Sequence, residues 1–131
     1  MIYVLDTNIA IYLFKGMGRV AERINALSPR EIAIPTVVLF ELYVGIAKSK
    51  NPATRTRLVE GLAARSIVLP FDQKAASCAA TVRAQLEKQG QPIGPMDVLI
   101  AGTAIANKTT LVTHNTREFS KVNGLVMEDW F

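Results

Sequence analysis

The sequence predicts an α/β domain in which helices cover both faces of a central, mainly parallel sheet of five strands. Short runs of β-branched and aromatic residues recur along the chain, and they alternate with segments whose apolar residues have helical spacing. A chain of 131 residues is also long enough to bury roughly 68% of its unfolded surface in one core. We therefore expect a single three-layer domain over residues 1–131.

The first half of the chain is expected to contain two strands and four helices. They are a strand at 2–5, helices at 9–15 and 20–27, a strand at 31–34, and helices from 36 to about 48 and at 53–64. Thr7 or Asn8 can cap the first helix, although Asp6 could also do so. Gly16 can end that helix, and Thr36 can cap the third.

The second half is expected to contain three strands and two longer helices. They are a strand at 66–69, a helix from 73 to about 89, a helix at 96–106, a strand at 110–113, a turn at 116–119 and a strand at 125–127. Asp72 can cap the first of these helices. Pro95 suits the first position of the second helix, which places Asp97 in its first turn.

Three acidic residues lie at the edges of apolar segments. Asp6 follows the first strand, Glu41 interrupts an apolar helical run, and Asp97 begins a helix. Ligands of parallel sheets bind beyond the carboxyl ends of the strands, so Asp6 and the segment Thr113–Asn115 should share one rim. Each acid alone could be a cap or an ordinary surface residue. Their combination instead suggests a metal site.

Carboxylates gathered at one rim need a neutralising cation. Two charges about 4 Å apart repel by about 4 kcal/mol at an effective dielectric constant near 20. Oxygen ligands without a suitably spaced Cys and His set favour Mg²⁺ or Mn²⁺ over zinc. Such an ion can activate water against a phosphodiester, so hydrolysis of a nucleic-acid backbone is the reaction that fits.

The charge balance suits a polyanionic substrate. The net charge is +4, and without Asp6, Glu41 and Asp97 the 15 Lys and Arg residues face 8 acids. A solvated mixed surface would explain this balance equally well. The single cysteine, Cys78, cannot form an internal disulfide, and neither a secretory signal nor a membrane span is expected. We expect a cytoplasmic protein.

Five motifs in this order resemble PIN domains, and more narrowly the VapC ribonuclease toxins of bacterial toxin–antitoxin pairs. They are Asp6-Thr7-Asn8, Glu41-Leu42, the run Pro92 to Asp97 with Ile100-Ala101, the run Thr113 to Phe119, and Glu128-Asp129-Trp130. The resemblance covers essentially the whole chain. It implies a PIN-like fold, an acidic pocket that binds Mg²⁺ or Mn²⁺, and endoribonuclease activity on structured RNA, with tRNA favoured over rRNA or mRNA. It also implies a VapB-type antitoxin as inhibitor and a homodimer.

The resemblance assigns the site residue by residue. Asp6, Glu41 and Asp97 match the three catalytic, metal-binding acids of the family. Many PIN domains have a further aspartate where this chain has Asn115, and Glu118 is the nearby carboxylate that could replace it. Whether Asn115 or Glu118 completes the site, and whether it holds one metal ion or two, stays open.

Neighbouring residues have supporting roles in this assignment. Thr7 and Thr113 could hydrogen-bond the carboxylates and fix their orientation. His114, Arg117 and Lys15 are candidates for contact with RNA. His114 is not needed as a general base when a metal ion activates water.

Two other functions are compatible with an aspartate after the first strand. A phosphatase of the haloacid-dehalogenase type would need a second acid two residues later, where this chain has Asn8. A non-catalytic flavodoxin-like binding module would need an aspartate after the third strand, for which Asp72 is the only candidate. Both remain alternatives at this level.

Overall fold

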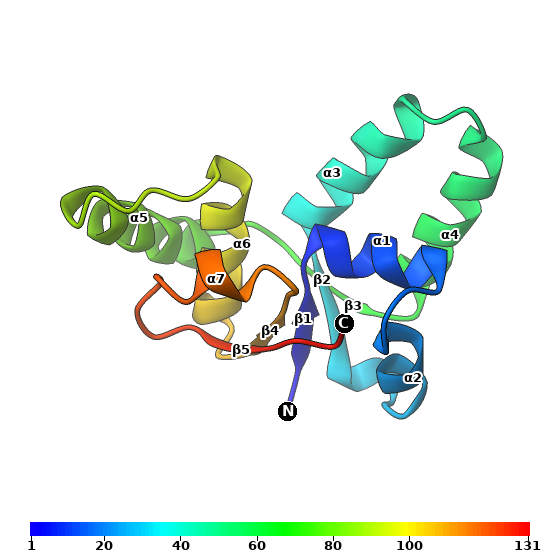
Figure 1. The fold of residues 1–131 in the computed structure, drawn as a ribbon, viewed down its shortest axis with the longest axis horizontal. Coiled ribbons are helices and arrows are strands. Elements are labelled where there is room, and N and C mark those ends of the chain that lie inside the picture. The colour runs from blue at the N-terminus through cyan, green and yellow to red at the C-terminus, as the bar shows by residue number, and fades with distance from the viewer.

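A computed structural model describes all 131 residues and contains one sheet. Its strands are β1 (Tyr3–Leu5), β2 (Ile32–Pro35), β3 (Ile67–Leu69), β4 (Thr110–Val112) and β5 (Val126–Glu128). The strand order is β3-β2-β1-β4-β5, and every neighbouring pair is parallel (Figure 1). The predicted fold class is confirmed, and the sheet is wholly rather than mainly parallel.

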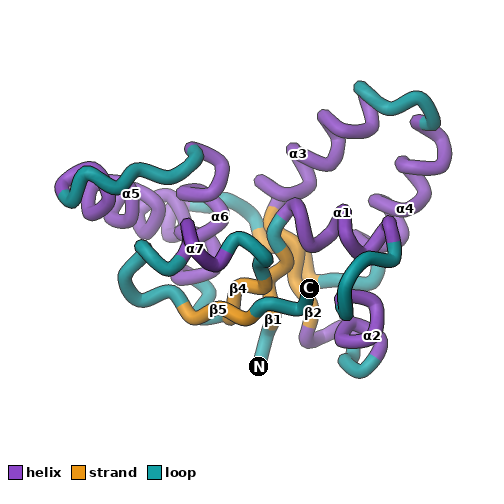
Figure 2. Tube along the Cα trace, viewed as in Figure 1, coloured by secondary structure: helices purple, strands orange, loops and turns teal.

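Seven α-helices flank this sheet. They are α1 (Thr7–Lys15), α2 (Val20–Asn25), α3 (Thr36–Ala47), α4 (Pro52–Ala64), α5 (Gln73–Lys88), α6 (Pro95–Ala106) and α7 (Thr116–Phe119), with one 3-10 turn at Pro29–Glu31. Figures 1 and 2 show α1 to α4 on one side of the strands and α5 to α7 on the other. None of these helices combines the length and the apolar character needed to cross a bilayer.

Most element boundaries agree with the sequence-based prediction. Each of the five strands lies within one residue of its expected bounds at both ends. The second helix ends at Asn25 rather than residue 27, and the short 3-10 turn was not expected. Residues 116–119, predicted as a short turn, form the four-residue helix α7. Short elements of this kind depend on tertiary contacts more than on local pattern.

For α1 the alternative cap Asp6 is the observed one, rather than Thr7 or Asn8, and the predicted cap of α3 was wrong. Helix α1 already begins at Thr7, so neither Thr7 nor Asn8 caps it; the Asp6 carboxylate accepts the Ile9 N–H at 2.8 Å and is the cap. Pro35 precedes α3, and Thr36 is the first helical residue. In both places the strand passes into the helix with no intervening loop, so α1 begins at Thr7, two positions before the predicted residue 9, and Thr36 lies inside α3 rather than at its cap.

One core spans the sheet and the helices on both sides of it. Among its fully buried residues are Val4 and Leu5 of β1, Leu111 of β4, and Ala101 of α6. Trp130, near the end of the chain, is 2% exposed and packs against the Tyr3 ring with centroids 5.2 Å apart. Strand β1 is therefore buried along Val4 and Leu5, directly before the first candidate acid.

Helices α5 and α6 are in backbone contact where Gly102 faces Ala79. A Cβ atom at Gly102 would lie 2.5 Å from the Ala79 Cβ and 2.6 Å from the Ala79 backbone nitrogen. We expect Gly102→Ala to lower the free energy of unfolding by about 1–3 kcal/mol, because the two helices must move apart. Urea denaturation followed by circular dichroism measures this change.

Gly61→Ala in α4 is the matched control for Gly102→Ala. No atom lies within 4 Å of a Cβ placed at Gly61. The free energy of unfolding of this variant should rise by about 0.5–1 kcal/mol, because alanine has a better helix propensity than glycine. If Gly102→Ala proved as stable as Gly61→Ala, the close contact between α5 and α6 would be disproved.

Candidate active site

The site lies between β1 and β4, where the order in which strands are added to the sheet reverses. From the central strand β1 the chain adds β2 and β3 on one side, and then β4 and β5 on the other. Asp6 follows β1 and its N–H donates to the Val112 carbonyl of β4 at 3.1 Å. Asp6 is 4% exposed, and Thr113, which follows β4, is fully buried. Both lie at the rim where ligands of parallel sheets bind.

Glu41 reaches this rim from α3. The Thr7 hydroxyl donates to Glu41 Oε1 at 2.5 Å, although the two residues are 34 positions apart in the chain. Thr7 is the first residue of α1, directly after Asp6. The hydrogen bond therefore holds the Glu41 carboxylate beside the start of α1, and Thr7 has the orienting role that the sequence suggested for it.

Asp97 approaches from the first turn of α6. A Cβ atom at Gly94 would lie 3.3 Å from Asp97 Oδ2, so the carboxylate folds back over the start of its own helix. The absence of a side chain at Gly94 leaves room for this conformation. The sequence pattern alone indicated no such role for Gly94.

Asn115 and Glu118 are bonded to each other at the same rim. The Asn115 side-chain amide donates to Glu118 Oε2 at 3.3 Å, and the Gly94 N–H donates to Glu118 Oε1 at 3.0 Å. Glu118 thus ties α7 to the start of α6. Both carboxylate oxygens of Glu118 already accept a hydrogen bond, whereas the Asn115 side-chain carbonyl oxygen accepts none.

The pKa values of Asp6 and Asp97 are both raised, chiefly by burial and further by nearby carboxylates. Burial raises the pKa of Asp6 to about 6, against hydrogen bonds from the Thr113 side chain and the Ile9 N–H that lower it, and the negative charges of Glu41 and Asp129 raise it further. Burial likewise raises the pKa of Asp97 to about 6, followed by the charges of Glu118, Asp6 and Glu41. Carboxyl groups from β1, α3, α6 and α7 therefore share one electrostatic environment, and no Lys or Arg forms an ion pair with any of them.

The donor set fits a hard divalent ion. No three Asp, Glu, His or Cys side chains form a ready-made metal cage. Mg²⁺ does not need such a cage, because it commonly takes one or two carboxylates and keeps several waters. The buried Asp6 and the half-buried Asp97 supply two carboxylates, and burial is the main reason that the pKa of each is raised. Their chemistry suits Mg²⁺ or Mn²⁺.

His114 is exposed and contacts the last residues of the chain. Its Nδ1 lies 2.9 Å from Asp129 Oδ2, and its ring stacks on Phe131 with centroids 4.2 Å apart. Sequence reasoning gave no role to Asp129, whose charge also acts on Asp6. Arg117 and Lys15 are exposed. Contact of these residues with RNA stays a prediction.

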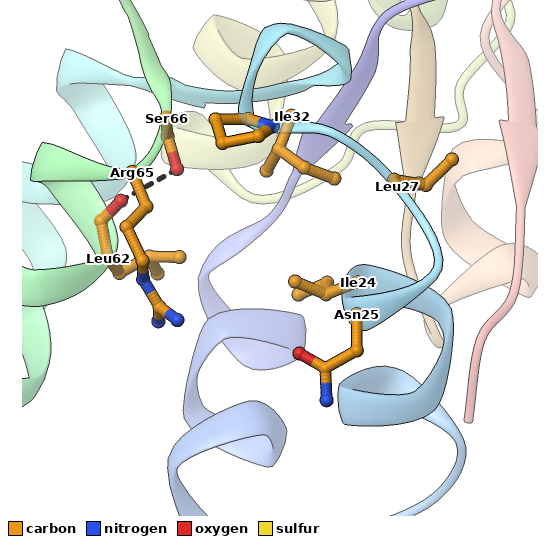
Figure 3. Close-up of a pocket in the computed structure, with 8 residues that line it drawn as sticks. Ile24, Asn25, Leu27, Ile32, Leu62, Arg65 and Ser66 are labelled. Atoms are coloured by element: carbon orange, nitrogen blue, oxygen red, sulfur yellow. Dashed lines mark hydrogen bonds between the residues drawn. The ribbon is translucent and has the colours of Figure 1, made fainter.

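A separate pocket of about 160 Å³ lies at the opposite end of the sheet (Figure 3). Ile32, the first residue of β2, lines it together with Ile24 of α2 and Leu62 of α4. The Ser66 hydroxyl at its edge donates to the Leu62 carbonyl at 2.7 Å. This pocket is at the amino ends of the strands and contains no carboxylate, so it is not the acidic site.

Comparison with known proteins identifies the family of this chain. Residues 3–125 match the PIN domain family. This chain belongs to the PIN domain family. The PIN domain described here is 43% identical over 129 residues to the tRNA(fMet)-specific endonuclease VapC of Shigella flexneri, covering 98% of this chain and 97% of the relative. It is 36% identical over 132 residues to ribonuclease VapC2 of Rickettsia felis, covering 99% and 98%.

Solved structures place the same PIN domain among VapC proteins. The DNA-bound VapBC of Salmonella typhimurium matches with a TM-score of 0.93 and 37% identity, covering 100% of this chain and 99% of that chain. VapBC2 of Rickettsia felis, bound to a DNA fragment from its promoter, matches with a TM-score of 0.92 and 34% identity over the full length of both chains. The predicted membership of the VapC family is confirmed.

Proposed function

We propose that this chain is the ribonuclease toxin of a toxin–antitoxin pair, a Mg²⁺- or Mn²⁺-dependent endoribonuclease that hydrolyses phosphodiester bonds in structured RNA. The observation that carries the proposal is the pair of carboxyls at the rim, Asp6 and Asp97, of which the first is buried and neither forms an ion pair with a Lys or Arg. The relatives named endonuclease and ribonuclease support the reaction class.

Each site residue has a definite role in this proposal. Asp6 and Asp97 would hold the ion, with Glu41 beside them directly or through water. A bound divalent ion lowers the pKa of its water and offsets charge that develops on the phosphodiester. Thr7 occupies Glu41 Oε1, which leaves Oε2 to accept a hydrogen bond from the attacking water. The Thr113 side chain orients Asp6.

Asn115 and Glu118 complete the rim in different ways. Glu118 uses both oxygens on Gly94 and Asn115, so we assign it a positioning role at the start of α6. The Asn115 side-chain carbonyl oxygen is available to a metal-bound water but carries no charge. Three carboxylates with one amide suit a single ion better than two.

The relatives support a substrate class and a partner for this proposal. A tRNA(fMet)-specific endonuclease at 43% identity over nearly the whole chain makes tRNA the favoured substrate. The structural neighbours are VapBC complexes, which supports a VapB-type antitoxin as the inhibitor. Helix α3 exposes Phe40, Tyr43 and Val44, an apolar patch of the kind that protein partners cover. We also propose that the protein forms a homodimer.

The alternative functions gain no support. Asp72, the candidate phosphoacceptor of a receiver-like module, is exposed and caps α5 by accepting the Ala75 N–H at 3.0 Å. Asn8 is exposed on α1. The family match covers residues 3–125 and leaves no room among these 131 residues for another catalytic domain.

Cleavage of total tRNA by the purified chain tests the proposal. With Mg²⁺ or Mn²⁺ we expect a small number of defined fragments, whose ends sequencing will map. An EDTA arm should give none, because the carboxylates alone do not activate water. Equal cleavage with EDTA, or no cleavage with either metal, would count against a metal-dependent ribonuclease.

A further inference from the structure

A second site on this protein lies at the far end of α1 from the acids. A cavity of about 200 Å³ opens there between α1 and the connection from α3 to α4. Its lining residues are Phe14, Lys15, Ser49, Asn51, Thr54, Arg55 and Leu58. Most of these residues belong to α4 and to the end of α1, and both helices lie to the right of the strands in Figure 1. None of the lining residues belongs to the acidic rim.

The cavity is positively charged and its charge is not neutralised. Lys15 and Arg55 line it, and no carboxylate does. The four ion pairs of the structure involve neither residue. Lys48 and Lys50, both exposed on the α3–α4 connection, add to the same field. The ligand that this charge favours is an anion.

Arg55 is held in an orientation suited to binding a phosphate. Its guanidinium carbon lies 5.8 Å from the centroid of the Phe14 ring, within cation–π range. Arg55 is only partly exposed, so its side chain is already restricted before a ligand binds. A pre-oriented guanidinium fork can donate two parallel hydrogen bonds to phosphate oxygens, which the ammonium group of a lysine cannot do.

Neutral polar groups surround the two cations. The Ser49 hydroxyl oxygen accepts the Asn51 N–H at 3.0 Å, which leaves the hydroxyl hydrogen to donate elsewhere. The side chains of Asn51 and Thr54 make no hydrogen bond within the protein. Such groups match the mixed donors and acceptors of a sugar-phosphate backbone.

Helix α1 connects this cavity to the acids. The helix begins at Thr7, which bonds Glu41, and ends at Lys15, so its nine residues separate the two sites by about 12 Å at 1.5 Å per residue. We propose that this cavity binds a backbone phosphate of the RNA substrate a few nucleotides from the bond that is cut. This inference rests on the proposed ribonuclease function and adds a subsite to it. An acidic protein segment would meet the same charges, but the position along α1 favours the substrate.

RNA binding in EDTA tests the subsite without cleavage. We would measure fluorescence anisotropy of a labelled RNA hairpin with an unpaired loop, over a range of salt concentrations. Lys15→Gln combined with Arg55→Gln should weaken binding at least tenfold near 0.1 M salt. The slope of log K against log salt should fall by about 0.7 for each phosphate that the variant no longer neutralises. Arg55→Lys keeps the positive charge but removes the forked guanidinium group. Its affinity for RNA should therefore lie between those of the wild type and the double variant.

The matched control removes two charges elsewhere. Lys74 and Lys88 are exposed on α5 and take part in no ion pair. Replacing both with Gln should change RNA binding much less than the cavity variant does. An equal decrease in the two double variants would overturn the subsite. So would unchanged RNA binding together with weaker binding of a glutamate-rich peptide, which would make the cavity a protein-binding site.

The two proposals can fail separately. A chain that binds RNA through the cavity but cuts no tRNA would contradict the ribonuclease activity alone. A chain that cuts tRNA while the cavity variant binds RNA like the α5 control would contradict only the subsite.

Discussion

Asp6→Asn is expected to abolish RNA cleavage by this chain while leaving its fold intact. Asparagine keeps the oxygen that accepts the Ile9 N–H, so the cap of α1 survives. The substitution removes the charge that would hold the metal ion, and we expect activity to fall by at least about 100-fold. Asp97→Asn should have the same effect. Cleavage of tRNA with Mg²⁺ or Mn²⁺, normalised to the wild-type rate, measures the decrease.

Asp72→Asn is the control that separates the metal-binding role of Asp6 from its role as a helix cap. Asp72 caps α5 as Asp6 caps α1, since its Oδ1 accepts the N–H three residues later at 3.0 Å. Asp72 is exposed and lies outside the rim, so Asp72→Asn should cleave RNA at the wild-type rate. Full activity in purified Asp6→Asn would remove Asp6 from the catalytic site. An equal decrease in both variants would indicate that caps, and not the site, were disturbed.

The fold of this chain could be predicted because its strands are local patterns. β1 and β4 belong to short, mainly apolar runs, and each strand is followed at once by a polar residue, Asp6 and Thr113. In a parallel sheet this placement alone puts both side chains at one rim. The central position of β1 beside β4 then brings the two segments together.

The contacts that shape the site could not be predicted in the same way. Thr7 bonds Glu41 across 34 positions, and Glu118 bonds Gly94 across 24. Both bonds depend on how α1 meets α3 and how α7 meets α6, which no local pattern specifies. The pairing of His114 with Asp129 likewise requires the last segment of the chain to return beside β4. Residue types indicated the chemistry, and only the fold indicated the partners.

The error at the start of α1 has a physical cause. Sequence preference places Thr and Asn at caps as readily as Asp, so Thr7 and Asn8 were reasonable choices. The Asp6 N–H is already bonded to Val112 of β4, which ends the strand at that residue and starts the helix at the next. Asp6 is consequently both a cap and the most buried acid of the rim.

Without metal, the stability of this protein is expected to fall as the pH rises from about 4 to about 6. An aspartate side chain in the unfolded chain has a pKa of 3.8, whereas the pKa of Asp6 in the folded chain is about 6. Between these two pH values the folded state therefore binds more protons than the unfolded state. The free energy of unfolding then decreases with pH by up to about 1.4 kcal/mol per pH unit for one carboxyl. Asp6 alone would contribute a decrease of about 3 kcal/mol, complete above pH 6. Asp97 adds a smaller share, because it is more exposed to solvent.

Denaturant titrations in EDTA at several pH values test this dependence. Comparison of the wild type with Asp6→Asn isolates the contribution of Asp6. Asp6→Asn cannot ionise, so its stability should change less between pH 4 and pH 6, and it should exceed the wild type above pH 6. Saturating Mg²⁺ should stabilise the wild type above pH 6 and have little effect on Asp6→Asn, since a ligand that binds only the folded state adds to its stability. A wild type whose metal-free stability rose with pH over this range would contradict the raised pKa of Asp6, because a buried carboxyl that is costly to ionise must destabilise the fold as it loses its proton.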